Sequence, residues 1–284
     1  MTQQKSQAKQ AEQFFKLHQQ DSPLILLNAW DAASAAIFEQ AGAPAIATSS
    51  AAIAVSFGYP DGEQLPFETL LDVIKRITAT IKIPLSVDFE AGFTKDTQKL
   101  LHYVDQLIEA GAVGINLEDR YPDLPNQLIP IQEQVIRIKA IKDHIKQSNK
   151  KLFINARTDV YWARHIDFDN REAEALKRLK VYEAAGADGL FIPGLNDFGT
   201  LSNFTQTLSC PINILGGENL DYSKTQQAGI KRISVGSLPM RFALTHLHSL
   251  GQSVLQGQFD RFENILSYDA LMMLAPHQDQ LNVD

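Results

Sequence analysis

The chain has 284 residues and a net charge of −7, and 44% of its residues are hydrophobic. This length suits one large α/β barrel of ~250 residues, and the hydrophobic content can form a substantial core and argues against disorder. The acidic balance, with no Lys/Arg cluster to offset it, argues against a nucleic-acid partner.

The single cysteine, Cys210, excludes an internal disulfide and fits a reducing compartment. No apolar run approaches the ~18 residues that would span a bilayer. The first 20 residues are rich in Gln and Lys and lack the apolar core of a signal peptide. We therefore expect a cytoplasmic protein that has no membrane partner.

Short apolar runs rich in β-branched residues alternate with longer amphipathic stretches along the chain. Such runs, bounded by turn residues and separated by helices, predict parallel strands joined by crossovers. The expected strands are 24–28, 45–48, 85–89, 114–118, 152–156, 189–192, 212–215 and 232–235. The main helices expected between them are 67–81, 97–109, 131–147, 171–184 and 238–255.

Eight strand–helix units predict a closed (β/α)₈ TIM barrel of the α/β class, with a doubly wound open sheet as the alternative. We expect a single domain over 1–284, with the barrel at about 24–257 and a C-terminal helical extension at about 258–276. The apolar stretch 259–274 is predicted to be one helix that buries its apolar face, for example against another subunit.

Acidic residues follow two neighbouring strands at the expected C-terminal mouth of the barrel. Asp88 and Glu90 stand two positions apart, so both point to one side of the strand, and Glu118 ends the next strand. Three converging carboxylates need a cation, a shared proton or an arginine. Hard oxygen ligands without a nearby His or Cys favour Mg²⁺ or Mn²⁺ over zinc. The alternative is that these acids cap loops and pair with Arg or Lys.

Two further side chains are candidates at this mouth. Arg157, at the end of the fifth strand, can hold a substrate carboxylate by paired hydrogen bonds. An ion pair with Glu118 or Asp159 is its alternative role. His165 follows the same strand and is a weaker candidate for proton transfer.

Together, these strand-end residues resemble those of the isocitrate lyase and phosphoenolpyruvate mutase superfamily, from about residue 24 to residue 257. The order of the motifs on the expected strands makes this resemblance specific. They are Thr48-Ser49-Ser50, Gly58-Tyr59-Pro60-Asp61, Val87-Asp88-Phe89-Glu90-Ala91-Gly92, Asn116-Leu117-Glu118-Asp119 and Asn155-Ala156-Arg157-Thr158-Asp159.

The resemblance implies a Mg²⁺ site in which Asp88 is the direct ligand, Glu90 and Glu118 hold metal-bound waters and Asp61 supports them. Asp61, Glu118 and Arg157 would thus be the catalytic residues. The resemblance also implies that a 2-oxo carboxylate binds to the metal, to Arg157 and to backbone N–H groups. The residues that would supply these N–H groups are Ser49, Ser50 and Ala51.

The chain also departs from the superfamily's patterns. Ser49-Ser50 stands where Ser-Gly is usual, and Glu90 stands where Asp is frequent. The loop 120–130 lacks the Lys-x-Cys-Gly-His motif of isocitrate and methylisocitrate lyases. It also lacks the Lys of phosphonate-processing members, although Asn126 could replace their Asn. Its three prolines predict an irregular surface loop, which we interpret as a gate over the site, with a rigid connection as the alternative.

The expected function is a Mg²⁺-dependent lyase or decarboxylase that cleaves a carbon–carbon bond next to a small 2-oxo acid through an enolate. Oxaloacetate decarboxylases of the superfamily need no thiol, which fits the loop of this chain. One alternative is phosphorus–carbon bond chemistry on a phosphonate, and another is a non-catalytic carboxylate-binding protein. By the same resemblance we expect a homotetramer or homodimer, since superfamily members commonly form tetramers that exchange a C-terminal helix.

Overall fold

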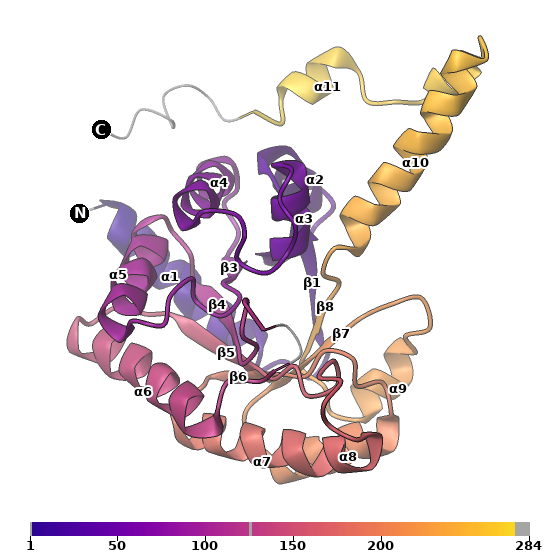
Figure 1. Ribbon diagram of the computed structural model, residues 1–284. Helices are drawn as coiled ribbons and strands as arrows, with labels where there is room; N and C mark the ends of the chain where they lie inside the picture. Colours follow the sequence, from indigo (N-terminus) through magenta and orange to yellow (C-terminus); the bar gives the residue numbers. More distant parts are fainter. Residues whose placement is uncertain (1, 125–126, 276–284) are drawn as a thin grey trace.

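The computed structural model describes residues 2–124 and 127–275 (Figure 1). Parallel strands pair in chain order and β8 returns to β1, so the sheet closes into a barrel. This confirms the TIM barrel and rules out the doubly wound sheet. The strands are β1 Leu24–Ala29, β2 Ile46–Thr48, β3 Leu85–Asp88, β4 Gly114–Glu118, β5 Phe153–Arg157, β6 Gly189–Phe191, β7 Ile212–Leu215 and β8 Arg232–Ser234.

Helices between the strands surround the barrel (Figure 1). The α-helices are α1 Thr2–Leu17, α2 Ala32–Gln40, α3 Ser50–Ser56, α4 Phe67–Thr80, α5 Thr97–Glu109, α6 Ile131–Gln147, α7 Arg171–Ala184, α8 Phe198–Thr207, α9 Tyr222–Gln227, α10 Leu238–Leu255 and α11 Tyr268–Met272. Short 3₁₀ turns are η1 Phe168–Asn170 and η2 Asp260–Phe262.

Helix α4 illustrates how the sequence forms this outer layer. Leu70, Ile74 and Ile77 recur at intervals of three and four residues, and all three are buried against the barrel. Burial of each such side chain contributes about 1.5–3 kcal/mol. Capping residues mark the start of other helices. Asp96 caps α5 and Asp197 caps α8, because each carboxylate accepts a backbone N–H of the first turn.

Helix α1 closes the N-terminal end of the barrel, and the sequence analysis did not predict it. Ala11 and Phe14 are fully buried, and the ring of Phe14 lies 5.5 Å from that of Phe153 on β5. The amide of Gln7 donates hydrogen bonds to the carbonyls of Ala112 and Lys151. The polar strand ends described below lie at the opposite, C-terminal end.

Branched apolar residues usually fill the interior of such a barrel. Here several polar side chains lie there as well. Asn116, Asn155, Asn213 and Ser234 are buried there. Arg232 of β8 reaches Asn116 of β4, on the far side of the barrel, with an N–O distance of 3.2 Å. The interior is therefore cross-linked by hydrogen bonds as well as packed.

The C-terminal part of the chain leaves the barrel. Helix α10 extends away from it, and α11 lies apart from the other helices (Figure 1). The expectation of one helix over 259–274 was wrong, because η2 and α11 are separate and short. Most large apolar residues of 259–274 are exposed and only Leu274 among them is buried, so within the described residues this segment packs little of its apolar surface. Within the described ranges, no helix is both long and apolar enough to cross a membrane.

Candidate active site

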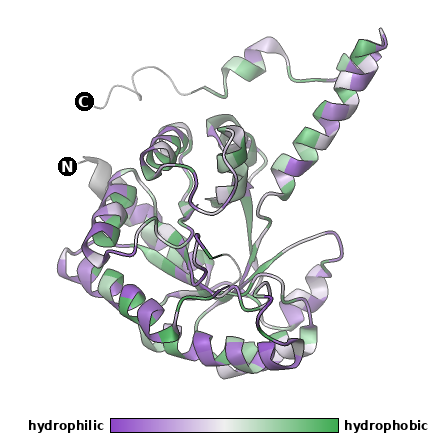
Figure 2. Cartoon of the chain, viewed as in Figure 1, coloured by the Kyte–Doolittle hydropathy of each residue, from purple (hydrophilic) through white to green (hydrophobic). Residues whose placement is uncertain are grey.

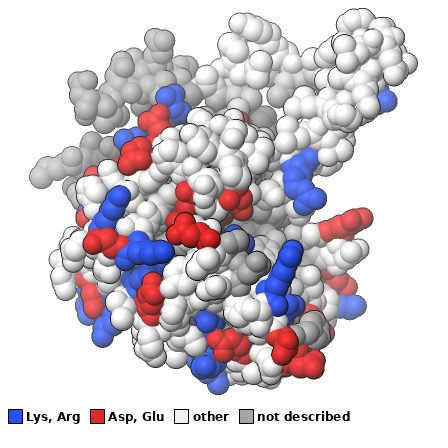
Figure 3. All heavy atoms as spheres, viewed as in Figure 1, with Lys and Arg blue, Asp and Glu red and all other residues white. Residues whose placement is uncertain are grey.

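Acidic side chains lie together near the centre of the face seen in Figure 3, with Lys and Arg around them. Asp88, the last residue of β3, is 9% exposed and accepts hydrogen bonds from the backbone N–H and the hydroxyl of Ser50, at 3.2 and 2.9 Å. The amide of Asn116 donates to its other oxygen at 3.3 Å. Donors on both oxygens thus hold the Asp88 carboxylate in one orientation.

Glu90 follows two residues later in a left-handed backbone conformation, with φ of 47°. Its carboxylate accepts a hydrogen bond from the backbone N–H of Glu63 at 2.8 Å. The sequence predicts that Asp88 and Glu90 lie on one extended strand. This expectation is wrong, because β3 ends at Asp88 and Glu90 is in a left-handed turn. Both remain at the mouth, and the charge of Asp88 contributes to the raised pKa of Glu90.

Arg157 lies among the carboxylates of the mouth. Its Nη1 is 2.7 Å from Glu118 and 3.8 Å from Asp88, and its other side forms two hydrogen bonds with Asp159, at 2.7 and 3.0 Å. The Nε of Arg120 also lies 3.4 Å from both Glu118 and Asp159. The ion pairs considered from the sequence are therefore formed, and one edge of Arg157 still faces Asp88 and Glu118.

The donor chemistry of this mouth fits a hard divalent cation, since it offers carboxylate oxygens from Asp61, Asp88, Glu90 and Glu118. Among the described residues, however, no three Asp, Glu, His or Cys side chains are already grouped around one point as metal ligands. Glu118 is engaged by arginines and Glu90 by a backbone N–H. This arrangement is compatible with one direct ligand, Asp88, and with Glu90 and Glu118 acting through water.

The pKa values reflect the crowding of negative charge. Burial and the charges of Asp61 and Asp88 raise the pKa of Glu90 to about 8. Enclosure by protein groups and the charge of Asp88 also raise the pKa of Asp61, although part of its side chain reaches solvent. Burial raises the pKa of Glu118, against the opposing charge of Arg157. A cation placed here would relieve this repulsion.

The expected carboxylate-binding backbone is the start of α3. Ser49 is its N-cap, and its hydroxyl accepts the N–H of Ala52 at 3.4 Å. Ser50 directs its own N–H and hydroxyl to Asp88, so this N–H is already used in the protein without ligand. Ala51 is half-buried in the first turn. The helix start and Asp88 are therefore neighbours.

One buried network was missed by the sequence analysis. Asp119 is fully buried and accepts hydrogen bonds from Arg178, Tyr182, Thr158 and the N–H of Asp159, at 2.7 to 2.9 Å. It thus fixes the segment that carries Asp159, the partner of Arg157. The acidic residue after Glu118 gave little sequence signal of this network, because two of its partners, Arg178 and Tyr182, come from the distant helix α7.

The loop 120–130 is described except for Pro125 and Asn126, so the suggestion that Asn126 replaces a family Asn lies outside the described residues. A bridge pairs Arg120 with Leu128, and the N–H of Tyr121 donates to Gln127 at 3.2 Å. The described part of this loop is therefore folded back on itself beside the mouth.

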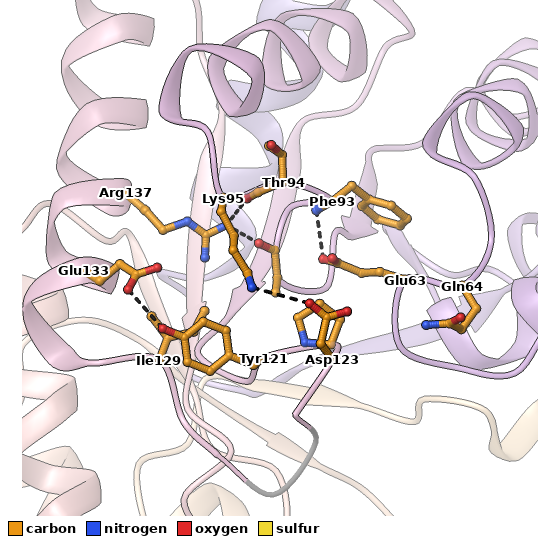
Figure 4. Close-up of a pocket in the computed structure, with 12 residues that line it drawn as sticks. Glu63, Gln64, Phe93, Thr94, Lys95, Tyr121, Asp123, Ile129, Glu133 and Arg137 are labelled. Atoms are coloured by element: carbon orange, nitrogen blue, oxygen red, sulfur yellow. Dashed lines mark hydrogen bonds and ion pairs between the residues drawn. The ribbon is translucent and has the colours of Figure 1, made fainter.

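Next to this loop is a pocket of about 250 Å³ (Figure 4). Lys95 lies over the ring of Tyr121 and 3.4 Å from Asp123, and thereby connects two loops. On the other side Glu63 accepts the N–H of Phe93 at 2.8 Å. Because the N–H of Glu63 also binds Glu90, this pocket adjoins the acidic mouth. His165, in contrast, is exposed and lines a separate surface pocket beside α7.

A variant of Glu90 should change the pH dependence of stability. A carboxyl group whose pKa is raised on folding stabilises the protein at low pH, and this contribution is lost as the pH rises. For Glu90 the window runs from the usual value of 4.5 to about 8. In EDTA, the Tm of the wild type should therefore fall across this window more steeply than that of Glu90→Gln.

The matched control is Glu68→Gln, at an exposed position in the first turn of α4. Its Tm should follow the wild-type pH curve. If the Glu90→Gln curve is as steep as that of the wild type, the raised pKa of Glu90 is refuted.

Hydrogen exchange should distinguish a gate from a rigid connection in the loop 120–130. A gate that closes over ligand must gain protection at Asp123 and Gln127 when Mg²⁺ and oxalate are added, because closure excludes water from the mouth. Equal exchange in both states would instead support the rigid connection. Peptides from α8, outside the mouth, serve as the internal reference.

Comparison with known proteins gives a consistent result over most of the chain. A family model described as phosphoenolpyruvate phosphomutase matches residues 14–255. An uncharacterized protein of Mycobacterium tuberculosis is 34% identical over 246 residues, which cover 86% of this chain and 90% of that protein. The 2-methylisocitrate lyase of Escherichia coli is 30% identical over 199 residues, 68% of this chain and 64% of that enzyme.

A solved structure of a candidate phosphonomutase from Burkholderia cenocepacia superposes with a TM-score of 0.82 at 34% identity. The superposition covers 86% of this chain and 99% of that one. Because the family model spans the barrel and the strand-end motifs, the chain belongs to the phosphoenolpyruvate phosphomutase family, within the isocitrate lyase and phosphoenolpyruvate mutase superfamily of enzymes.

Proposed function

We propose that this enzyme is a Mg²⁺-dependent lyase or decarboxylase that breaks a carbon–carbon bond next to a small 2-oxo acid through an enolate. The observation that carries the proposal is the position of Arg157, 2.7 Å from Glu118 and 3.8 Å from Asp88. A guanidinium that faces carboxylates at a barrel mouth offers an anion-binding edge beside a potential cation site. Both are needed to bind a 2-oxo carboxylate.

Asp88 would hold the metal directly, while Glu90, Glu118 and Asp61 would hold its water ligands; Mn²⁺ suits the same oxygens. Bound Mg²⁺ supplies Lewis-acid stabilisation of the negative charge that develops on the substrate as the bond breaks. The chain itself would orient the substrate.

Arg157 would donate to the substrate carboxylate with the edge that now faces Glu118, while Asp159 keeps the guanidinium plane fixed. The backbone N–H groups at Ser49, Ser50 and Ala51 would bind the same carboxylate from the other side. This requires Ser50 to exchange its bond with Asp88 for one with the substrate. Binding and loss of an internal hydrogen bond are thus coupled.

The loop after β4 favours decarboxylation over retro-aldol cleavage. It carries no Cys or His between residues 120 and 130 that could protonate a departing carbanion. Carbon dioxide needs no proton from the enzyme when it leaves. The residues of this loop next to the mouth would then determine which leaving group fits.

The second candidate function is phosphorus–carbon bond chemistry on a phosphonate. The likeness to the candidate phosphonomutase of Burkholderia cenocepacia, at 34% identity, favours it. It would use the same metal and the same carboxylate site, so only the group attached to the 2-oxo acid differs.

Turnover assays separate these functions. The enzyme is given oxaloacetate, other small 2-oxo acids and phosphonopyruvate, each with Mg²⁺ or with EDTA. Mg²⁺-dependent release of pyruvate from a carbon-linked substrate supports the lyase. Phosphate release from phosphonopyruvate alone would favour the second candidate. Binding without any turnover would contradict both and leave a carboxylate-binding protein.

We further propose that the protein is cytoplasmic and that copies of it associate as a homotetramer or homodimer through the C-terminal segment. Helix α10 extends from the barrel with hydrophobic residues along it (Figure 2). Phe242, Leu247 and Leu255 are 68%, 58% and 90% exposed, and apolar residues on and around η2 and α11 are exposed too. Exposed apolar surface on this scale is typical of an association site.

Charged residues introduced on α10 should therefore lower the number of chains in the oligomer. The double substitution Phe242→Glu and Leu247→Glu removes apolar area and adds charge that cannot be buried without a partner. Light scattering coupled to gel filtration should give a smaller mass for this variant than for the wild type. Gln252→Glu, on the same helix, should keep the wild-type mass. A monomeric wild type would contradict the proposal.

A further inference from the structure

Arg232 is a buried arginine that the proposed reaction does not use. It lies on β8, is 1% exposed and projects into the barrel interior. Its Nη2 is 3.2 Å from the Asn116 oxygen and 3.5 Å from the Ser86 hydroxyl, and its Nε is 3.4 Å from the Ser234 hydroxyl. All of these acceptors are neutral. A buried guanidinium with only neutral partners is costly, so its presence calls for a charge that it compensates.

The charge that it can compensate is that of Asp88. Within the described ranges Arg232 forms no ion pair, and Asn116, which hydrogen-bonds to both side chains, stands between it and Asp88. Burial lowers the pKa of Arg232 to about 9, and the negative charge of Asp88 opposes this fall. The side chain is therefore a cation at neutral pH. Arg232 is the first residue of β8, whereas Asp88 is the last residue of β3, so Arg232 lies nearer the N-terminal end of the barrel.

Asn116 connects the two residues. Its oxygen accepts hydrogen bonds from Arg232 and, at 2.8 Å, from the amide of Asn155. Because both donors bind the oxygen, the NH₂ group must point the other way, where it donates to Asp88 at 3.3 Å. Arg232 and Asn155 thus set the orientation of the Asn116 amide, and this amide in turn orients the Asp88 carboxylate.

His18, a titratable group close to Arg232, does not offset its charge. His18 of the segment after α1 has a pKa lowered to about 3, by burial and then by the charge of Arg232. Its Nδ1 lies 2.8 Å from the carbonyl of Phe14, so the neutral ring donates there. His18 is therefore neutral, and the carboxylates of the mouth are what Arg232 can balance.

We propose that Arg232 is a positioning residue for the acidic site: it fixes the Asn116 amide and places a positive charge beneath Asp88, and so holds the Asp88 carboxylate against its acidic neighbours. The inference concerns the site of the proposed function. The coupling between the two side chains, however, exists without substrate or metal and can be measured independently of any activity.

A double-mutant cycle on the metal-free protein tests it. Arg232→Met is compared in the wild type and in Asp88→Asn, which removes the charge but keeps the shape. We expect Arg232→Met to lower the Tm by about 3 °C more when Asp88 is present than when it is Asn, the size expected for a coupling of roughly 1 kcal/mol in a chain of this length. Equal losses in both backgrounds would overturn the proposal.

Arg137→Met is the matched control. Arg137 of α6 is also a buried arginine, and among the described residues it donates to neutral groups, the carbonyls of Ala91 and Thr94 and the side chain of Gln134. The fall in Tm caused by Arg137→Met should be the same whether position 88 is Asp or Asn. Coupling of equal size for both arginines would mean a general relaxation of the fold and would overturn the specific role of Arg232.

Two more variants keep the test decisive. Arg232→Lys retains the charge and should retain most of the coupling to Asp88, which a purely space-filling role would not predict. If Arg232→Met does not fold, Arg232→Gln replaces it in the cycle, because it keeps a polar side chain and removes only the charge. If the falls in Tm caused by Arg232→Gln and Asp88→Asn are additive, the proposal is again contradicted.

Discussion

Replacement of Asp88 with alanine is expected to abolish Mg²⁺ binding and to reduce turnover by about 1,000-fold or more. Ser50 and Asn116 orient both oxygens of Asp88, and Asp88 is the acid proposed to ligate the metal directly. Loss of Lewis-acid stabilisation of about 4 kcal/mol corresponds to this factor. The fold should survive with a stability loss of about 1–3 kcal/mol, because the donors of Ser50 and Asn116 lose their acceptor.

Calorimetric titration with Mg²⁺ measures the first effect, and the turnover assay measures the second. Asp72→Ala, which removes an exposed carboxylate on α4, should bind Mg²⁺ as the wild type does. If Asp88→Ala binds the ion with wild-type affinity, the metal lies elsewhere and the assignment of the site is wrong.

Arg157→Lys is expected to weaken oxalate binding by about 5- to 150-fold, or ~1–3 kcal/mol, the scale of a charged hydrogen bond. Lysine keeps the charge but loses the planar fork that binds Asp159 at 2.7 and 3.0 Å. It also loses the contact of the guanidinium with the ring of Trp162, whose centre is 5.0 Å away. The remaining ammonium cannot bind Asp159 and a substrate carboxylate in the same way at once.

Oxalate affinity and thermal stability must be measured together, since Arg157 also holds the mouth together. Arg76→Lys, in an exposed pair with Asp72, should change neither. A large loss of stability with unchanged oxalate affinity would show that Arg157 is structural. The anchoring role requires that affinity falls in protein that is still folded.

Much of the barrel could be predicted from the sequence, because its strands are short apolar runs set between amphipathic helices. The strand expected at 114–118 is β4 as observed, and the helices expected at 97–109 and 131–147 are α5 and α6. These elements bury continuous apolar faces, so local pattern and tertiary packing favour the same structure.

The ends of the chain were harder to predict for opposite reasons. In α1, many Gln and Lys residues hid the apolar face of Ala11, Phe14 and Leu17, whose spacing of three is helical. The apolar residues of 259–274 predict a helix, yet most of them find no surface to pack on in the described part of the chain, and only Leu274 is buried. A pattern predicts an element only where a partner surface exists to bury it.

The sequence predicted which candidate residues meet at the barrel mouth and which ion pairs Arg157 forms, but not the buried networks behind them. Strand order brought Asp88, Glu118 and Arg157 to one mouth. The contacts that Arg232 and Arg178 make with residues more than 50 positions away depend on the closed barrel. The left-handed turn at Glu90 was also missed, because a glutamate gives no local signal for it.

A crystal structure with Mn²⁺ in place of Mg²⁺, and with oxalate as a mimic of the pyruvate enolate, tests the central claim most directly. The anomalous signal of the ion should lie at Asp88, with Glu90 and Glu118 around its water ligands. Oxalate should contact the ion, Arg157 and the backbone at Ser50 and Ala51. An ion bound away from Asp88, or oxalate bound in the pocket beside Glu63 with no contact to Arg157, would contradict the account.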